Sequence, residues 1–107
     1  MTLVRLCNVD DVPEGEARRF EHDHRPVAVA NLGSEGFRAI DAICSHAHYF
    51  LDEGEIDVED ETVECPKHGS TFDLNTGTPR SLPATTPVDV FAVKVDGADV
   101  MIEVPDE

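Results

Sequence analysis

The chain has 107 residues, of which 40% are apolar and 29% charged, a balance that fits one soluble globular domain. The formal net charge of −15 argues against binding nucleic acid or an anionic membrane surface. No apolar run approaches the roughly 20 residues that cross a bilayer, and the first residues lack the apolar core of a signal peptide. We therefore expect a cytoplasmic protein with no membrane contact.

Short strand-like segments separated by turns run along the chain and predict an all-β fold. The segment 17–22 is polar and fits either a strand or one helical turn. Asp96-Gly97 is a strong hairpin signal between the last two strands. Seven glycines and seven prolines interrupt every helical pattern. In chain order, the expected strands are 2–8, 17–22, 26–32, 37–43, 62–65, 70–73, 88–95 and 98–104.

Alternation assigns the faces of the first expected strand. Val4 and Leu6 share one face, and Cys7 is expected on the other face with Leu3 and Arg5. Cys7 stands apart from the other two cysteines, and an odd cysteine count in a cytoplasmic protein argues against a disulfide framework. We interpret it as a small buried residue, with a reactive thiol as the alternative.

Two short clips each combine one cysteine with one histidine: C-x-H at Cys44 and His46, and C-x-x-H at Cys65 and His68. Thiolates and imidazoles together suit zinc or iron–sulfur chemistry. Zinc sites generally place like ligands in pairs, C-x₂₋₄-C or H-x₃₋₅-H. The mixed clips fit a binuclear centre better, with both thiolates on one iron and both imidazoles on the other. A zinc-binding interaction module remains the alternative.

The ligand set also sets the charge of such a centre. An oxidised [2Fe–2S] core carries about +2, so two thiolates and two neutral imidazoles leave a total near zero. Four thiolates would leave about −2. The mixed set therefore accepts an electron more easily than an all-cysteine site.

The part of the chain from about residue 43 onward resembles the Rieske-type ferredoxins of bacterial aromatic-ring dioxygenase systems, and the preceding strands fit as well. The resemblance rests on the two clips followed, in order, by Gly69-Ser70-Thr71-Phe72-Asp73, Thr76-Gly77, Pro83-Ala84 and Pro87. Together these motifs are highly specific.

The resemblance implies an all-β Rieske fold in a single domain, 1–107. Residues 1–42 and 86–107 would form an antiparallel β-sandwich base, with a small cluster-binding subdomain inserted at about 43–85. Cys44, His46, Cys65 and His68 would bind one [2Fe–2S] cluster. The segment 82–84 would cover that cluster as a third loop, and the histidine edge would lie near solvent.

The function implied is one-electron transfer without catalysis. A flavin-dependent, NAD(P)H-oxidising reductase would reduce the chain, a monomer, which would pass electrons to a terminal Rieske oxygenase that dihydroxylates aromatic rings. The alternatives are a Rieske ferredoxin serving another oxygenase, an assembly operon or a redox sensor. Biphenyl, naphthalene and carbazole systems all fit, with a slight preference for the carbazole type.

Departures from respiratory Rieske proteins indicate a low potential. Tyr49 and Lys67 stand where those proteins carry a disulfide. By the same comparison, Ser70 would retain one of the two hydroxyl donors toward sulfur, whereas Phe72 lacks the other. Fewer hydrogen bonds to sulfur predict a potential at the low end of the Rieske range, roughly −150 mV.

Several neighbouring residues carry two interpretations. His48 is expected to be a loop residue near the cluster, because its spacing from Cys44 does not match the clip. His22 and His24 fit a solvated turn, or a weak metal site. The segment 49–51 either packs under the first clip or forms an apolar docking rim. The acidic run 52–61 is either a solvated face or a docking surface for the reductase or oxygenase.

Overall fold

The structure is a computed structural model, which describes residues 2–44, 49–66, 69–81 and 86–104. Antiparallel strands dominate it, and helical structure within these ranges is limited to short 3-10 turns. These turns are η1 (Val9–Asp11), η2 (Gly33–Glu35) and η3 (Leu51–Glu53). The prediction of an all-β fold is confirmed.

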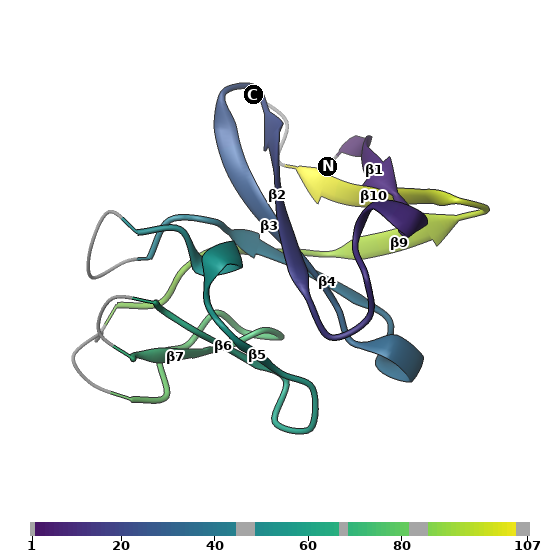
Figure 1. Cartoon of the computed structure of the whole chain (residues 1–107). Helices are drawn as coiled ribbons and strands as arrows, with labels where there is room; N and C mark the ends of the chain where they lie inside the picture. Colours follow the sequence, from purple (N-terminus) through teal and green to yellow (C-terminus); the bar gives the residue numbers. More distant parts are fainter. Residues whose placement is uncertain (1, 45–48, 67–68, 82–85, 105–107) are drawn as a thin grey trace.

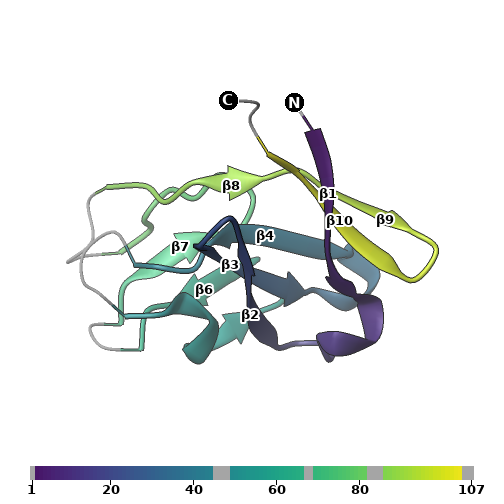
Figure 2. The ribbon, with the colours of Figure 1, turned by 90° about the horizontal axis from the view of Figure 1, so that it is seen from above.

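The described residues form three antiparallel sheets (Figure 1). The four-stranded sheet has the order β2-β3-β4-β8, and the two smaller sheets have the orders β1-β10-β9 and β5-β6-β7. Figures 1 and 2 place the two smaller sheets on opposite sides of the four-stranded sheet. The strands are β1 (Thr2–Asn8), β2 (Ala17–His22), β3 (Arg25–Asn31), β4 (Phe37–Asp41), β5 (Ile56–Asp57), β6 (Thr62–Glu64), β7 (Thr71–Asp73), β8 (Val90–Phe91), β9 (Val93–Asp96) and β10 (Asp99–Val104).

The apolar run in the second hairpin is explained by burial on both faces of β3. Val27, Ala28, Val29 and Ala30 are all buried, and β3 pairs with β2 on one side and β4 on the other. Side chains of a strand point alternately to opposite faces, so the two valines and the two alanines enter different cores. β3 therefore separates two packed interiors.

We name these interiors after the cysteines they contain. The Cys7 core lies between the four-stranded sheet and the sheet of β1, β10 and β9, and the two-cysteine core lies between the four-stranded sheet and the sheet of β5, β6 and β7. The buried residues of the Cys7 core are Cys7, Val12, Val27, Val29, Ala39, Val100 and Ile102. Those of the two-cysteine core are Ala17, Ala28, Ala30, Leu32, Ile40, Ala42, Cys44, Leu51, Val63, Cys65, Phe72, Leu74 and Val88.

The face predicted for Cys7 is wrong, because β1 contains a bulge. Arg5 pairs with Met101 and Cys7 pairs with Val100, so one extra residue, Leu6, is inserted opposite β10. A bulge of this kind shifts the alternation of side chains. As a result, Cys7 is only 2% exposed and points into the core, whereas Leu3 on the same predicted face is 40% exposed.

The single strand predicted for 88–95 is also wrong. The chain forms β8 in the four-stranded sheet, leaves the ladder at Ala92, and continues as β9 in the sheet of β1 and β10. The backbone of Ala92 still accepts a hydrogen bond from Glu103 N–H at 3.0 Å. The alternative of a helical turn at 17–22 is excluded, since this segment is the edge strand β2.

Candidate metal centre

Cys44 lies just beyond the end of β4, in a segment whose backbone folds back on itself. Its N–H donates to Tyr49 O at 2.9 Å, and Leu51 N–H donates to Ala42 O at 2.7 Å. An isolated bridge between Ile43 and Phe50 lies between these two bonds. The Cys44 side chain is 3% exposed. The backbone therefore fixes where the first clip leaves the sheet.

Cys65 holds the matching position beyond β6, at the start of the turn that leads to β7. Its N–H donates to Ser70 O at 2.7 Å, and its carbonyl accepts from Gly69 N–H at 3.0 Å. Gly69 has a φ of +73°, which glycine adopts without the strain that a side chain would add. The Cys65 side chain is 1% exposed. Backbone hydrogen bonds therefore position the second cysteine, as they do the first.

Both cysteines belong to the same buried cluster of side chains, the two-cysteine core, and neither forms a disulfide with a described residue. Buried thiols brought together from two separate loops fit the thiolate side of an iron–sulfur centre, since soft sulfur ligands suit iron in such clusters. The predicted ligands His46 and His68 lie outside the described residues, as do His48, Lys67 and the segment 82–84. The described geometry therefore concerns the cysteine half of the predicted site.

Ser70 and Phe72 are both fully buried beside the second clip. Ser70 is one of few polar residues in the described interior, and its carbonyl bonds to the Cys65 backbone. Phe72 packs into the two-cysteine core and pairs with Val63 across the β6–β7 hairpin. The surroundings of Cys65 are thus apolar on the β7 side apart from one hydroxyl.

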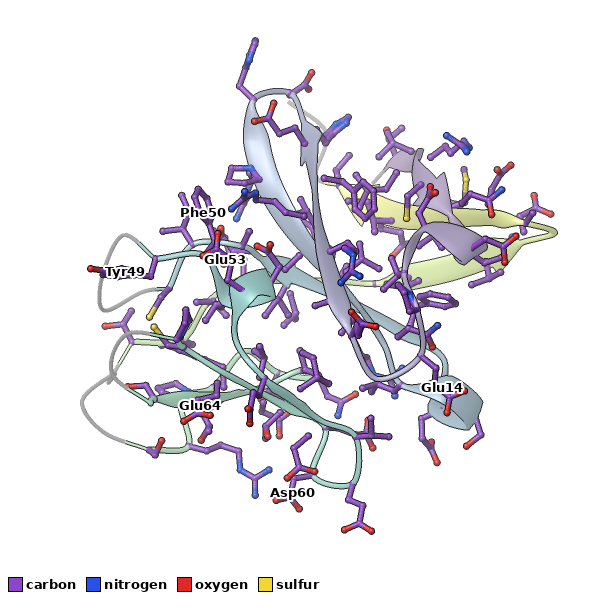
Figure 3. All side chains as sticks on the ribbon, in the orientation of Figure 1. Glu14, Tyr49, Phe50, Glu53, Asp60 and Glu64 are labelled. Carbon is purple, nitrogen blue, oxygen red and sulfur yellow. The ribbon has the colours of Figure 1, made fainter. Side chains whose placement is uncertain are left out.

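Residues 49–51, which follow the first clip, do not all fit the same one of the two interpretations, packing under the clip or forming an exposed apolar rim. Leu51 is fully buried in the two-cysteine core, whereas Tyr49 is 41% exposed beside the clip. Phe50 lies under the guanidinium of Arg19, whose Cζ is 3.6 Å from the ring centroid. Figure 3 shows Tyr49 and Phe50 on this side of the molecule, with Glu53 near them. Packing under the loop is confirmed for Leu51 and, in part, for Phe50, which is partly buried against the same core.

The acidic run contains both paired and exposed carboxylates. Glu61 accepts from the guanidinium of Arg38 at 3.0 Å. Asp57 is exposed in β5, and Asp60 is exposed at the tip of the β5–β6 turn (Figure 3). Most of the run is therefore a solvated hairpin surface, while Glu61 takes part in holding that hairpin to β4.

Asp52 differs from its neighbours because its side chain is only 11% exposed. Its Oδ1 is buried and has no hydrogen-bond partner among the described residues, and the nearest guanidinium nitrogen, Nη1 of Arg19, is 3.8 Å away. Burial raises the pKa of Asp52 above its usual range, and the charge of Arg19 partly opposes that rise. Nothing in the sequence pattern singled out Arg19 or this carboxylate, because their contact joins an edge strand to a loop far along the chain.

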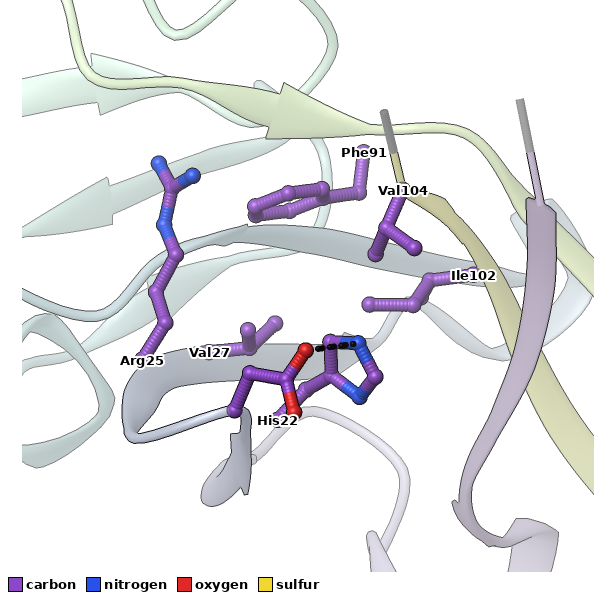
Figure 4. Close-up of a pocket in the computed structure, with 7 residues that line it drawn as sticks. His22, Arg25, Val27, Phe91, Ile102 and Val104 are labelled. Atoms are coloured by element: carbon purple, nitrogen blue, oxygen red, sulfur yellow. Dashed lines mark ion pairs between the residues drawn. The ribbon is translucent and has the colours of Figure 1, made fainter. Parts of the chain in front are cut away.

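His22 and His24, the histidines outside the clips that were considered as a weak metal site, belong to the end of β2 and the β2–β3 turn. His22 Nε2 is 3.5 Å from the carboxylate of Asp23 at the β2–β3 turn. Both border a pocket of about 190 Å³ between β3, β8 and β10, whose walls include Phe91, Ile102 and Val104 (Figure 4). Within the described part of the chain, no three His, Cys, Asp or Glu side chains are grouped to hold a metal ion. This segment reads as a polar turn beside an apolar pocket.

No helix in the described segments is long and apolar enough to cross a bilayer.

Cys7, the third cysteine, is shielded in its own core. Burial, followed by the charge of Asp11, raises the pKa of its thiol to about 11. A thiol with that pKa stays protonated and unreactive near neutral pH. The interpretation of Cys7 as a buried residue is confirmed.

Comparison with known proteins gives consistent relationships. The family model of the Rieske [2Fe-2S] domain matches residues 2–92. The ferredoxin component of biphenyl 2,3-dioxygenase from Rhodococcus jostii (strain RHA1) is 41% identical, over 96% of this chain and 94% of its own length. The 3-phenylpropionate/cinnamic acid dioxygenase ferredoxin subunit of Escherichia coli (strain K12) is 45% identical, over 99% of this chain and 97% of its own length.

Solved structures agree with these relationships. The ferredoxin of carbazole 1,9a-dioxygenase from Nocardioides aromaticivorans IC177 superposes with a TM-score of 0.88, at 35% identity, over 95% of this chain and 97% of its own. A ferredoxin in a complex of reduced oxygenase and oxidised ferredoxin of carbazole 1,9a-dioxygenase gives a TM-score of 0.83, at 35% identity, over 94% of this chain and 91% of that one. The chain therefore belongs to the Rieske [2Fe-2S] domain family and, within it, to the ferredoxin components of aromatic-ring dioxygenase systems, which carry electrons on a [2Fe-2S] cluster and are not the catalytic subunits.

Proposed function

We propose that Cys44 and Cys65 bind one iron of the cluster and that His46 and His68 bind the other. The observation that carries this proposal is the burial of the two thiols in one core, each at the mouth of a clip that contains a histidine. The bound cluster supplies a reversible one-electron acceptor. The mixed ligand set leaves a centre near neutral charge, which suits it to accept electrons.

The chain's own residues control the surroundings of that centre. Leu51, Val63 and Phe72 exclude water from the cysteine side, since all three are essentially buried. An apolar environment disfavours the extra negative charge that reduction brings, and a phenyl ring at position 72 donates no hydrogen bond toward sulfur. Both effects support a potential at the low end of the Rieske range.

The partners proposed are a flavin-containing NAD(P)H reductase as donor and a terminal Rieske oxygenase that dihydroxylates aromatic rings as acceptor. The oxygenase is supported by the related ferredoxin that was solved in complex with its oxygenase. The net charge of −15 suits partners that present basic patches. We propose that the carrier acts as a monomer in the cytoplasm.

We also propose that residues of about 43–85 form a cluster-binding subdomain on a base made by 1–42 and 86–107. The sheet of β5, β6 and β7 falls wholly inside that range, which supports the division. The two-cysteine core, however, takes residues from both parts, including Ala28 and Phe72. The subdomain would therefore be docked tightly on the base.

Replacing each cysteine by serine tests the ligand assignment. We expect Cys44→Ser and Cys65→Ser to lose the visible absorption and the reduced-state EPR signal completely, whereas Cys7→Ser keeps both. Metal analysis of the parent protein should give about two irons per chain and no zinc. Reduction with dithionite should take up about one electron per chain.

Retention of the normal Rieske signal in Cys44→Ser or Cys65→Ser would refute the assignment. A colourless zinc protein would instead support the interaction module. Turnover with purified reductase and oxygenase then tests the partners. Ring hydroxylation should stop when this chain is omitted, and normal reduction without any hydroxylation would contradict the proposed acceptor.

A further inference from the structure

One arginine of the four-stranded sheet reaches the segment that follows the first clip. Arg19 lies on β2, the edge strand of that sheet, opposite Ala28. Its guanidinium stacks on Phe50 at 3.6 Å, and its Nη1 is 3.6 Å from Glu53 Oε2 and 3.8 Å from Asp52 Oδ1. A single side chain thus contacts both ends of η3.

The segment held by Arg19 is hydrogen-bonded to the backbone at Ala42 and at Cys44 itself. Leu51 N–H donates to Ala42 O, and Tyr49 O accepts from Cys44 N–H. Phe50, the residue under the guanidinium, lies between these two hydrogen bonds and bridges to Ile43. Displacing Phe50 would therefore shift the backbone that carries Cys44.

The other end of η3 contacts β6, the strand that leads into Cys65. Gly54, which closes η3, packs so tightly that a Cβ at this position would overlap the carbonyl oxygen of Glu64. Glu64 N–H in turn donates to Glu55 O at 2.9 Å. Since Glu64 precedes Cys65 directly, η3 lies between the two cysteine-bearing segments and contacts both.

We propose that Arg19 is a positioning residue for the cluster, which holds η3 against β2 and thereby sets the spacing of the Cys44 and Cys65 segments. This inference rests on the proposal that these two cysteines bind the cluster. The contacts of Arg19 in the described part of the chain are to Phe50, Asp52 and Glu53, not to Cys44 or Cys65. It acts through Phe50 and the backbone bonds around η3.

The geometry calls for a guanidinium and not merely a positive charge. A planar guanidinium stacks on a ring face while its edge reaches carboxylates, whereas a lysine ammonium is a compact, strongly hydrated charge. Arg19→Lys therefore keeps the charge and loses the combined contact. Arg19→Gln loses both.

The test measures how fast a chelator removes iron from the oxidised protein, followed by the decay of visible absorption. We expect Arg19→Gln and Arg19→Lys to release the cluster about five- to tenfold faster, the combined worth of a stacked cation and two partly exposed ion pairs. The matched control is Arg5→Gln, which removes the same charge from a strand and breaks an ion pair with Asp99. We expect it to release the cluster at the parent rate.

Two further readouts separate positioning from general stability. The EPR line shape of the reduced cluster should change in both Arg19 variants and stay unchanged in Arg5→Gln, while circular dichroism checks that each variant is folded. A parent release rate in Arg19→Gln, full rescue by Arg19→Lys, or equal acceleration by Arg5→Gln would each overturn the proposal. The ligand assignment is tested separately: it would fail if Cys44→Ser or Cys65→Ser kept the cluster, whatever the arginine variants show.

Discussion

The two cores of this protein both contain cysteine, but they place it differently relative to the strands. In the Cys7 core, the thiol belongs to β1, a seven-residue strand that pairs along its length with the six-residue β10. In the two-cysteine core, the strands beside the thiols are shorter, and Cys44 and Cys65 lie just beyond strand ends. The cysteine within a ladder serves as packing, whereas the two proposed ligands lie where the chain leaves its strands.

The shared strand β3 supplies each core with a different size of side chain. Val27 and Val29 fill the Cys7 core, whereas Ala28 and Ala30 face the two-cysteine core. Small residues on that face let η3 and the β6–β7 hairpin approach the sheet closely, and larger side chains such as Phe72 fill the remaining space. The cysteine-bearing segments thus pack against the small side chains of Ala28 and Ala30.

The strongest test of this comparison removes one large side chain from each core. Phe72→Ala and Ile102→Ala each delete a fully buried side chain and should cost about 3–5 and 2–5 kcal/mol respectively. We expect Phe72→Ala to lower the iron content of the purified protein, because the cavity opens beside Cys65. Ile102→Ala should lower the urea concentration at which the sheets are half unfolded, yet keep full iron content. Equal iron loss in both variants would show that the two cores act as one.

A smaller effect is expected from Gly54→Ala, which tests the contact between η3 and β6. The backbone must move to relieve the overlap with Glu64, and overpacking of this kind costs about 1–3 kcal/mol. Gly97→Ala, at the β9–β10 turn, is the control: its Cβ would meet nothing, although its φ of +63° adds some strain. Chemical unfolding followed by circular dichroism and by cluster absorption should show faster cluster loss for Gly54→Ala alone. Unaltered cluster retention in that variant would contradict the role of η3.

The smallest effect expected concerns the buried thiol of Cys7 at alkaline pH. Its pKa in the folded state is raised to about 11 from an unfolded value near 9.0, so the folded chain keeps a proton that the unfolded chain loses. This contribution is present below about pH 9 and is lost as the pH rises through 11, which should lower the stability by about 1–2 kcal/mol at pH 10.5. Urea unfolding of the parent and of Cys7→Ala at pH 8 and pH 10.5 measures the difference. A Cys7→Ala variant that loses as much stability as the parent would remove Cys7 as the cause.

The sequence was sufficient for most strands because alternation and turn residues are local signals. The hairpin at Asp96-Gly97 and the buried run at β3 were both predicted and both confirmed. The bulge at Leu6 and the break at Ala92 were missed, since each depends on how a strand pairs with a distant partner. Local patterns do not contain that register.

The candidate site, too, was predictable from the sequence only in part. The spacing of the clips indicated Cys44 and Cys65 as ligands, and the structure places both thiols in one buried cluster. The contact of Arg19 with Phe50 could not be predicted, because Arg19 stands in a polar edge strand with no motif around it. Only the folded sheet reveals that this side chain faces η3.

The double burial of β3 also bears on motion. Its backbone is hydrogen-bonded to β2 and to β4 and both of its faces are covered, so it is the segment whose amides open last. Edge strands such as β2, β5 and β9 pair with only one other described strand and open more readily. The edges of the sheets can therefore fray while β3, the strand shared by both cores, stays closed.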